Sequence, residues 1–489
     1  MFAEFLQSSP ERETPAKGRD ASPAPSGLLR KILSNWLAKR AVRHKAPAPA
    51  PRERAVEEDA PPRIIIDLTD VVCHAIWHDA CAGIPRVQLE IARALLARNP
   101  VAQALGWHRN KWSDLGPLIL AADGDVDRIF ALLKETFCDI RWNAKGALLL
   151  LRRRRRNLNI ERYAEAPDLR PQDALFIGGA FWLNREIVNL CKDAAGKGAN
   201  LIVLFHDLIP LAMPSFTGHD FAREYREMLS LPAHFVVTTE QTRSELKRAR
   251  RRIDGWGGRI SSSVTPLADE FPGSARNETA GAAPPRLAAL AVQGFALCVG
   301  TIEIRKNHFL LMTAWEELAA ERGGDMPKLV IAGRRGWKAQ ATLNRIDALE
   351  PDGAICFIEA PSDDELRWLY AACSFTVFPS LFEGWGLPVG ESFWFGKPCA
   401  ASNAQSIGPV ARDLCAAFSP HHLDDMKSAI RRLLDADQRA AFQRRIEAAP
   451  LRQWSEFAAE IEALIAERRP MSDPLLLRES EDSPAAKAA

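Results

Sequence analysis

Two carboxylates separated by seven residues are the feature of this sequence with the clearest chemical potential. Glu383 and Glu391 flank the segment Gly384-Trp385-Gly386-Leu387-Pro388-Val389-Gly390. The glycines let backbone amides approach a ligand closely, and a helix start attracts anionic groups because its amides are unpaired. Carboxylates suit hydroxyl groups and amides suit phosphates, so the segment fits a sugar nucleotide, which offers both. The plainer interpretation is that the two glutamates are a solvated face.

The flanking sequence predicts where each glutamate lies. The apolar run Phe375-Thr376-Val377-Phe378-Pro379 predicts a buried parallel strand. Pro388 suits the first residue of a helix, and Gly396-Lys397-Pro398 is its stop signal. Glu383 then lies in the strand-to-helix loop, and Glu391 lies in the first turns of the helix.

A second candidate segment precedes this one. Residues 298–308 predict a strand, a turn at Gly300, and the adjacent cations Arg305 and Lys306 before a helix that includes Phe309. Two cations at a helix start are suited to bind a diphosphate. Without further support, the same two residues would be an ordinary solvated helix start.

Strands and helices alternate through this half of the chain. Further strands are predicted at Lys328–Arg334 and Ile355–Ile358, and Ser362 or Asp363 can cap the helix that follows. This alternation predicts an α/β fold with a doubly wound parallel sheet. Ligands of such sheets bind at the carboxyl ends of the strands, where both candidate segments lie.

Together these segments resemble the retaining family 4 glycosyltransferases, in their mannosyltransferase-like branch. The resemblance implies the GT-B fold, in which two Rossmann-like, doubly wound parallel-sheet domains face each other across a cleft. It covers about residues 62 to 470 and rests on the pair Glu383 and Glu391, Val299–Asn307, Phe205–Pro210, Ile64–Asp67 with Gly83–Val87, and Arg452-Gln453-Trp454.

The resemblance implies a role for each matching residue. Glu391 would bind the ribose hydroxyls of a nucleotide, and Glu383 would hold hydroxyls of the transferred sugar. Lys306, helped by Arg305, would neutralise the departing pyrophosphate. The remaining expected donor-binding or sugar-facing positions are Gly83, His206, Gly384, Trp385, Gly386 and Leu387.

Several of these positions also have a plainer interpretation. His206 could be a satisfied core histidine, and Gly83 could be a turn glycine. Trp385 and Tyr225 suit packing better than stacking on a sugar. The resemblance implies neither a covalent nucleophile nor a metal, and it implies same-face attack in which the departing phosphate accepts the acceptor's proton.

Three departures from the family pattern leave the donor open. Thr301 follows Gly300 where some relatives have arginine, Ser406–Val410 lacks a glutamate, and the loop at Gly83 has a single glycine. The segment Gly300–His308 favours GDP-mannose, but users of UDP-sugars share that motif.

The expected function is therefore that of a retaining, metal-independent hexosyltransferase without a cofactor. It would move a hexose from a nucleotide-diphosphate sugar to a saccharide or a lipid-linked glycan in cell-surface polysaccharide biosynthesis. Three alternatives stay open: a non-catalytic GT-B subunit, a nucleotide-sugar epimerase of the same fold, and a membrane scaffold. The presence of Lys306, Glu383 and Glu391 argues against the first, and an epimerase is not expected to carry this pair of glutamates.

Composition agrees with a large enzyme. The 489 residues are 47% hydrophobic, enough for two domain cores, and a net charge of +2 does not suggest nucleic acid as a partner. The nine cysteines include no C-x-x-C pair, which favours a reducing compartment. Neither a signal peptide nor a run of 18 apolar residues is evident, so a cytoplasmic location is expected.

Shifts in composition predict the domain organisation. The stretch 101–170 is less regular than the rest of this domain and is expected to include an insertion facing the acceptor. The predicted parts are a disordered tail at 1–60, an amino-terminal acceptor-side domain at 61–272, a linker at 273–290, a carboxy-terminal nucleotide-sugar domain at 291–450, a helix at 451–470 that returns to the first domain, and a disordered tail at 471–489.

Two basic segments predict contact with the inner face of the cytoplasmic membrane. Within residues 28–45, Leu29, Ile32, Leu33, Trp36 and Leu37 share one helical face among lysines and arginines, as in an interfacial helix. Residues 152–156 are five arginines that follow four leucines. The alternatives are packing of the helix on protein and an ordinary solvated loop.

Overall fold

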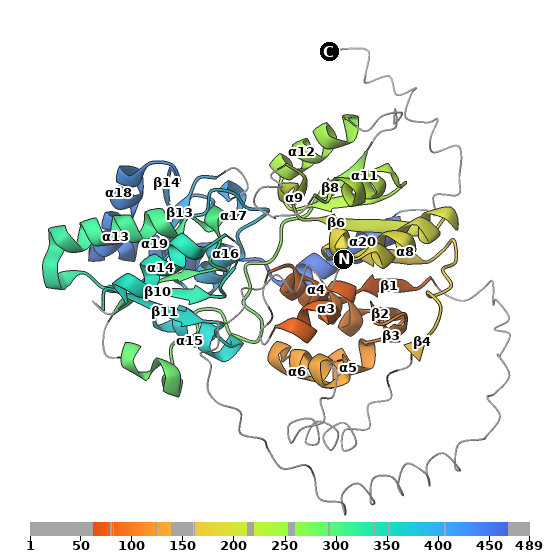
Figure 1. Cartoon of the computed structure of the whole chain (residues 1–489), viewed down its shortest axis with the longest axis horizontal. Helices are drawn as coiled ribbons and strands as arrows, with labels where there is room; N and C mark the ends of the chain where they lie inside the picture. The colour runs from red at the N-terminus through yellow and green to blue at the C-terminus, as the bar shows by residue number, and fades with distance from the viewer. Residues whose placement is uncertain are drawn as a thin grey trace, which may run out of the picture. The chain divides into compact units, whose positions relative to one another are not determined.

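The computed structural model describes residues 62–467, apart from 79–80, 82, 123–124, 138–159, 161, 213–219, 253–259, 292–293, 337, 351–352 and 405–406. The predicted tails and both basic segments, 28–45 and 152–156, lie outside the described residues. Two β-sheets, each with helices on both faces, make up the described part of the chain (Figure 1).

The amino-terminal sheet has the strand order β4-β3-β2-β1-β5-β6-β7-β8. Strands β2, β1, β5, β6, β7 and β8 pair in parallel, whereas β2–β3 and β3–β4 are antiparallel. The prediction of a parallel sheet is therefore confirmed for six of the strands, and the edge formed by β3 and β4 is antiparallel. The strands are β1 (Ile64–Asp67), β2 (Ala102–Trp107), β3 (Trp112–Asp114), β4 (Arg162–Tyr163), β5 (Ala174–Ile177), β6 (Asn200–Phe205), β7 (His234–Val237) and β8 (Ser261–Val264).

Both faces of this sheet are buried under helices. Ile64 and Ile66 of β1 face one core and Ile65 faces the other, as the two-residue period of a strand requires. A strand covered on both faces reads as a continuous apolar run. The helices are α3 (Thr69–Trp77), α4 (Ile84–Arg98), α5 (Gly116–Ala121), α6 (Val126–Phe137), the 3₁₀ turn η1 (Phe181–Leu183), α8 (Arg185–Gly196), α9 (Ile209–Ala212), α11 (Ala222–Ser230) and α12 (Glu240–Arg251).

The expectation of irregular structure across 101–170 is wrong for residues 102–137. Strands β2 and β3 and helices α5 and α6 occupy this stretch. Strand β2 has the sequence AQALGW, which has no β-branched residue, so strand propensity gave no signal. Pairing with the neighbouring strand β1 forms it instead.

The carboxy-terminal sheet has the strand order β11-β10-β9-β12-β13-β14, and all its pairs are parallel. Its strands are β9 (Phe295–Val299), β10 (Lys328–Gly333), β11 (Ile355–Glu359), β12 (Phe375–Phe378), β13 (Cys399–Ser402) and β14 (Ala416–Phe418). Its helices are η2 (Pro285–Leu290), η3 (Ile304–Lys306), α13 (His308–Arg322), η4 (Gly323–Asp325), α14 (Gln340–Leu349), α15 (Asp363–Ala372), α16 (Leu387–Trp394), α17 (Gly408–Ala411), α18 (Leu423–Leu434) and α19 (Ala436–Ala448).

The strand order of this sheet reverses between β9 and β12. The chain adds β10 and β11 on one side of β9 and then returns to place β12 on the other side. Such a switch point opens a crevice at the carboxyl ends of the two central strands, where the loops diverge. The loops that leave β9 and β12 are the two candidate segments of the sequence analysis.

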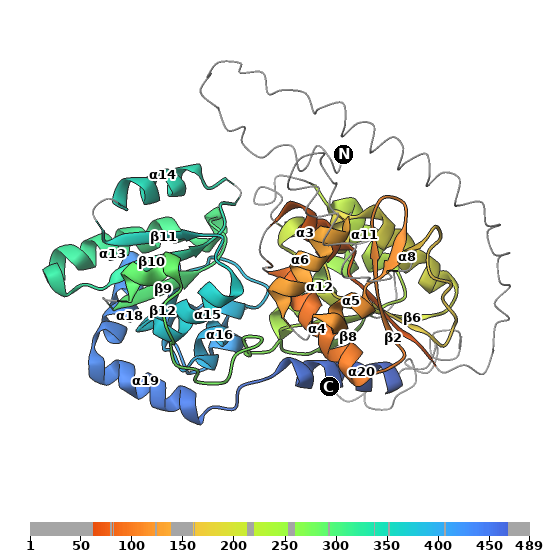
Figure 2. The same ribbon diagram turned by 90° about the horizontal axis from the view of Figure 1, so that it is seen from below.

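Helix α20 (Trp454–Glu467) packs on α4 of the amino-terminal half (Figure 2). Its Trp454 is fully buried and donates a hydrogen bond from Nε1 to the carbonyl of Glu270 over 3.2 Å. An ion pair of 2.8 Å joins Arg98 of α4 to Glu462 of α20. Across the ranges that the structure describes, no helix has both the length and the apolar character to cross a membrane.

We expect Gly333→Ala to destabilise the carboxy-terminal sheet. A β-carbon at Gly333 would lie 1.9 Å from the backbone oxygen of Gly300, so one of the two turns must move. Overpacking against backbone should lower the free energy of unfolding by at least about 1 kcal/mol. Urea unfolding measures this loss, with Gly196→Ala as the control because a β-carbon there meets open space. Equal stability of the two variants would contradict the tight packing.

Candidate active site

Backbone and side-chain hydrogen bonds tie the two loops of the switch point together. The amide of Leu381 donates to the carbonyl of Arg305 over 2.8 Å, and Arg305 Nη1 donates to the carbonyl of Phe382 over 3.1 Å. Asn307, in the left-handed conformation with φ 59°, donates from Nδ2 to the carbonyls of Pro379 and Pro420 over 3.2 and 2.8 Å. These contacts hold the turn after β9 against the loop after β12.

This arrangement brings three of the predicted site residues together. Lys306 Nζ lies 2.6 Å from Glu383 Oε1, and Arg305 Nη1 lies 3.0 Å from Glu383 Oε2. Burial alone would raise the pKa of Glu383, but the positive charges of Arg305 and Lys306 outweigh it and lower the pKa to about 2. Glu383 is therefore ionised at neutral pH.

The charges of this cluster are balanced in the protein alone. Arg305 also pairs through Nε with Glu303 over 2.9 Å, so two cations face two carboxylates. An incoming diphosphate would compete with Glu383 for the same two cations, because phosphate oxygens are strong acceptors for them. That competition would release the oxygens of Glu383 to accept hydrogen bonds from hydroxyl groups.

Glu391 lies in a different environment from Glu383. It is 8% exposed on α16, and the hydroxyl of Tyr370 donates to its Oε2 over 2.7 Å. Burial raises the pKa of Glu391, while the charge of Arg86 and the hydrogen bond from Tyr370 oppose that rise. The aromatic ring of Tyr370 stacks on Phe395 with centroids 5.5 Å apart, which fixes the direction of its hydroxyl.

Arg86 is a residue of this region that the sequence analysis missed. It lies on α4, is 4% exposed, and forms an ion pair with Asp363 at the start of α15. Its guanidinium lies 5.2 Å from the ring centroid of Phe271, and that ring lies 5.9 Å from the ring of Tyr370. A cation three residues after Gly83 was the available sequence signal.

The capping prediction at the start of α15 is settled in favour of Ser362. Its hydroxyl accepts a hydrogen bond from the amide of Glu365, whose carboxylate accepts one from the amide of Ser362. This capping box leaves the Asp363 side chain available for Arg86. The amide of Asp363 donates to Asp127 Oδ2 over 3.2 Å, and burial and the charge of Asp363 raise the pKa of Asp127 to about 6.

Gly83 begins the first turn of α4 with a backbone that favours glycine. Its φ is 62° and its ψ is −136°, and it precedes Ile84 as the helix cap. A β-carbon at this position would have nothing within 4 Å, so space alone does not require glycine. Its conformation therefore accounts for the residue, and a contact with phosphate stays a prediction.

His206 follows β6 and is 7% exposed. Its Nε2 lies 2.8 Å from the carbonyl oxygen of Gly178, and burial lowers the pKa of the ring. In the neutral ring, Nε2–H donates to that carbonyl and Nδ1 remains an acceptor. The hydrogen bond to Gly178 thus fixes the orientation of the His206 ring. This agrees both with a core histidine and with a residue that faces the sugar.

The loop after Glu383 contacts His206 and its neighbours. A β-carbon on Gly384 would lie 2.6 Å from the backbone oxygen of His206. The hydroxyl of Thr238, after β7, donates to the carbonyl of Gly384 over 2.8 Å. Glycine at 384 therefore permits the close approach between the two halves, and this approach places His206 beside the glutamate loop.

The remaining predicted positions lie at the start of α16. Trp385 is 6% exposed and belongs to a hydrophobic cluster, and the fully buried Tyr225 packs on Phe205. Gly386 caps the helix with φ 110°. The helix begins at Leu387, one residue before the predicted start at Pro388.

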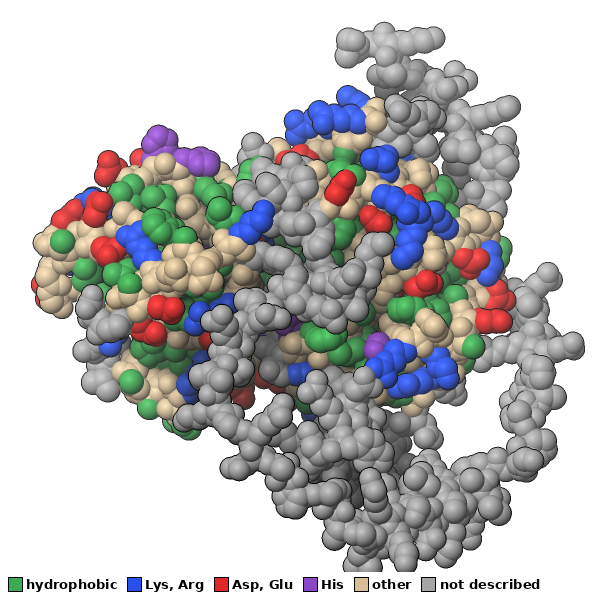
Figure 3. All heavy atoms as spheres, in the orientation of Figure 1, with side chains coloured by type: hydrophobic (Ala, Val, Ile, Leu, Met, Phe, Trp, Pro, Cys, Tyr) green, Lys and Arg blue, Asp and Glu red, His purple; other side chains and the backbone are tan. Residues whose placement is uncertain are grey.

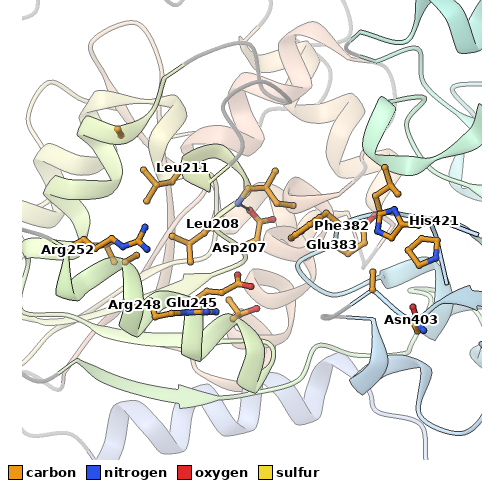
Figure 4. Close-up of a pocket in the computed structure, with 18 of the residues that line it drawn as sticks. Asp207, Leu208, Leu211, Glu245, Arg248, Arg252, Phe382, Glu383, Asn403 and His421 are labelled. Carbon is orange, nitrogen blue, oxygen red and sulfur yellow. Dashed lines mark hydrogen bonds between the residues drawn. The ribbon is translucent and has the colours of Figure 1, made fainter. Parts of the chain in front are cut away.

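A cavity of about 700 Å³ adjoins this cluster (Figure 4). Glu383 and Phe382 line it on one side, and Asp207 lines it from the loop after β6. Burial and the charge of Glu383 raise the pKa of Asp207 to about 6, against the hydrogen bond from Ile209 and the charge of Arg305. Among the described side chains, no group of three or more His, Cys, Asp or Glu residues could hold a metal ion.

The two sheets, their helices and the return of α20 define a class of protein. A structure of an alpha,alpha-trehalose-phosphate synthase (UDP-forming) from Burkholderia vietnamiensis matches 86% of this chain and 99% of its own chain, with a TM-score of 0.54 and 12% identity. At that identity the match shows the fold alone, and this fold is GT-B.

The carboxy-terminal domain can be placed more closely. Residues 289–450, which carry Arg305, Lys306, Glu383 and Glu391, match the family described as Glycosyl transferases group 1. The domain is thus a group 1 glycosyltransferase domain, which confirms that part of the resemblance seen in the sequence.

Two relatives from Escherichia coli match parts of the chain. The "O-antigen chain mannosyltransferase B" is 34% identical over 148 residues, which are 30% of this chain and 39% of that protein. A "Serotype-specific mannosyltransferase WbdA" is 34% identical over 170 residues, which are 34% of this chain and 20% of that protein. The chain thus spans less than half the length of either relative.

We expect removal of one partner of the buried Arg86–Asp363 pair to destabilise the protein strongly. The two side chains are only 5% and 11% exposed, so Asp363→Asn leaves a buried guanidinium without its counter-charge. The free energy of unfolding should fall by about 3–5 kcal/mol, and the double variant Arg86→Met/Asp363→Leu should recover much of this loss.

The neighbouring pair Arg367–Asp364 is the matched control for urea unfolding. Asp364 is 79% exposed, so Asp364→Asn should cost less than about 1 kcal/mol. Similar losses in Asp363→Asn and Asp364→Asn would show that the buried pair has no special weight.

Proposed function

We propose that this protein is a retaining glycosyltransferase that moves a hexose from a nucleotide-diphosphate sugar to a saccharide or lipid-linked glycan. The observation that carries the proposal is Glu383, held by Arg305 and Lys306 at the switch point of a group 1 glycosyltransferase domain. Glu391, on the helix that follows, supplies a second buried carboxylate.

The donor would lie across the carboxyl ends of β9 and β12. Its diphosphate would replace Glu383 as the partner of Arg305 and Lys306, with the amides of Gly384, Trp385, Gly386 and Leu387 beside it. The freed carboxylate of Glu383 would accept hydrogen bonds from the hexose hydroxyls. Glu391, oriented by Tyr370, would accept hydrogen bonds from the ribose hydroxyls.

In the reaction, the bond between the anomeric carbon and the diphosphate breaks while a bond to the acceptor oxygen forms on the same face. The acceptor's proton passes to the departing phosphate, so no protein base and no metal is required in this scheme. Lys306 and Arg305 stabilise the charge that develops on the leaving group. His206, with Nδ1 as an acceptor, would bind a hydroxyl of the hexose or stabilise positive charge near the anomeric carbon.

The donor favoured in this proposal is GDP-mannose. The names of both Escherichia coli relatives describe mannosyltransferases, and one of them describes an O-antigen chain. This supports a role in cell-surface polysaccharide biosynthesis, on the cytoplasmic side of the membrane. Peripheral membrane contact through residues 28–45 and 152–156 is part of the same proposal, with 61–272 as the acceptor-side domain and 291–450 as the donor-side domain.

A binding screen tests the donor site directly. Calorimetry with GDP, UDP and ADP should show selective binding of one nucleotide, and Glu391→Gln should weaken it about tenfold or more because a charged acceptor for the ribose is lost. The exposed Glu447 on α19 provides the control variant Glu447→Gln, which should bind normally. If the folded protein binds none of these nucleotides, the proposal gives way to a non-catalytic subunit.

Lys306→Ala tests the leaving-group contact. The variant should lose about 2–4 kcal/mol of transition-state stabilisation, since it removes one preorganised charge from the diphosphate. The assay follows release of the nucleoside diphosphate from the donor that the screen identifies. Lys328→Ala, at the opposite end of β10 from the site, is the control and should keep its turnover. Near-normal turnover in Lys306→Ala would rule out this role.

A further inference from the structure

The cavity beside Glu383 extends well beyond the proposed donor site. From Glu383 and Asp207 it continues along α9, α11 and α12 of the amino-terminal half. Figure 4 shows Arg248 and Arg252 at one end of the cavity and Glu383 at the other. Asp207 lies between these two ends. A donor at the switch point would contact the Glu383 end and leave the rest of the cavity open to a different ligand.

Three arginines line the far part of this cavity. They are Arg226 on α11 and Arg248 and Arg252 at the end of α12, and all three are exposed. None of the three has an acidic or hydrogen-bonding partner among the described residues, whereas nearby Arg223 and Arg243 pair with acids over 2.9 Å. Unpaired cations that line one cavity repel each other and favour an anionic ligand.

The position of α12 explains only part of this pattern. Cations near the carboxyl end of a helix interact favourably with its dipole, which suits Arg248 and Arg252. The dipole also suits Lys247 and Arg251, which are exposed on the same turns but do not line the cavity. Arg226 lies on another helix, so the dipole of α12 does not account for it.

The wall between the arginines and Asp207 is mainly apolar, and its polar members are Thr242 and Glu245, whose carboxylate accepts a hydrogen bond from Gln241 over 2.6 Å. Leu208 and Leu211 from the loop and helix after β6, Leu229 from α11 and Ala249 from α12 line it. An inorganic anion would leave this surface without a partner. A ligand with an anionic group and a short apolar segment would cover both surfaces.

We infer that this cavity binds the acceptor, with a phosphate or diphosphate group on Arg226, Arg248 and Arg252, an apolar chain on the leucines, and the accepting sugar toward Asp207 and Glu383. The inference rests on the proposed function, because the accepting hydroxyl must reach the hexose held at Glu383. The ligand class is therefore a lipid phosphate that carries a glycan.

The same arginines form part of a wider basic surface. In Figure 3, Lys and Arg side chains gather over α12. The exposed residues there include Lys247, Arg248, Arg251 and Arg252. An acceptor anchored in a membrane would bring its phosphate to this surface, and an anionic membrane would also attract all four residues. If an acceptor in the cavity supplies the phosphate, the essential residues are Arg226, Arg248 and Arg252. If a membrane surface supplies it, Lys247 and Arg251 contribute as well.

Calorimetry with geranyl diphosphate tests the inference on the full-length protein. The nucleotide that binds the donor site is present at saturation, so that the probe cannot occupy the pyrophosphate position at Lys306. We expect Arg226→Gln/Arg248→Gln/Arg252→Gln to weaken binding of the probe about tenfold or more. The control, Lys247→Gln/Arg251→Gln, removes two charges from the same helix and should change the affinity less than about twofold.

Each outcome decides the inference. Binding by the wild type that only the triple variant loses supports it. No binding by the nucleotide-loaded wild type, or equal losses in both variants, overturns it. It is also overturned if the triple variant keeps its affinity for geranyl diphosphate but loses binding to phosphatidylglycerol vesicles, because the arginines then contact the membrane surface. If the triple variant still binds the nucleotide, it is folded and its donor site is intact. A failure of the proposed function would instead appear as a wild type that binds no nucleotide.

Discussion

The adjacency of β9 and β12 is the constraint on which the candidate site depends. Because these strands pair side by side in the carboxy-terminal sheet, the turn that holds Arg305 and Lys306 lies against the loop that holds Glu383. A buried carboxylate is stable only when a charge or hydrogen bonds compensate it. The two cations do so here, and they lie where a parallel sheet of this order opens its crevice.

The two glutamates of the motif are chemically unlike in the folded protein. Glu383 is held ionised by two cations, whereas burial raises the pKa of Glu391 and a tyrosine hydroxyl provides its close contact. A diphosphate can displace Glu383 from its cations but has no such effect on Glu391. The separate partners therefore suit a ligand whose diphosphate competes for the cations of Glu383 and whose neutral hydroxyl groups reach Glu391.

Contacts between the two halves reinforce this division of roles. The Arg86–Asp363 pair joins α4 to α15, and its arginine connects through Phe271 and Tyr370 to the surroundings of Glu391. Gly384 meets the backbone of His206 at the other end of the motif. Both ends of the glutamate segment therefore contact the amino-terminal half. The cavity with the three arginines starts at Glu383 and Asp207.

The sequence by itself determined the local elements and the chemical character of the motif. Apolar runs predicted the strands β9, β10, β11 and β12, and glycine, proline and serine signals predicted the turns and caps, because these depend on neighbouring residues. The sequence did not reveal β2, which exists through pairing with β1, or the partners Arg86 and Asp363, which are 277 residues apart. The tertiary structure decided these features and the convergence of Arg226, Arg248 and Arg252 on one cavity, because strand order and the packing of the two halves bring together residues that no local pattern links.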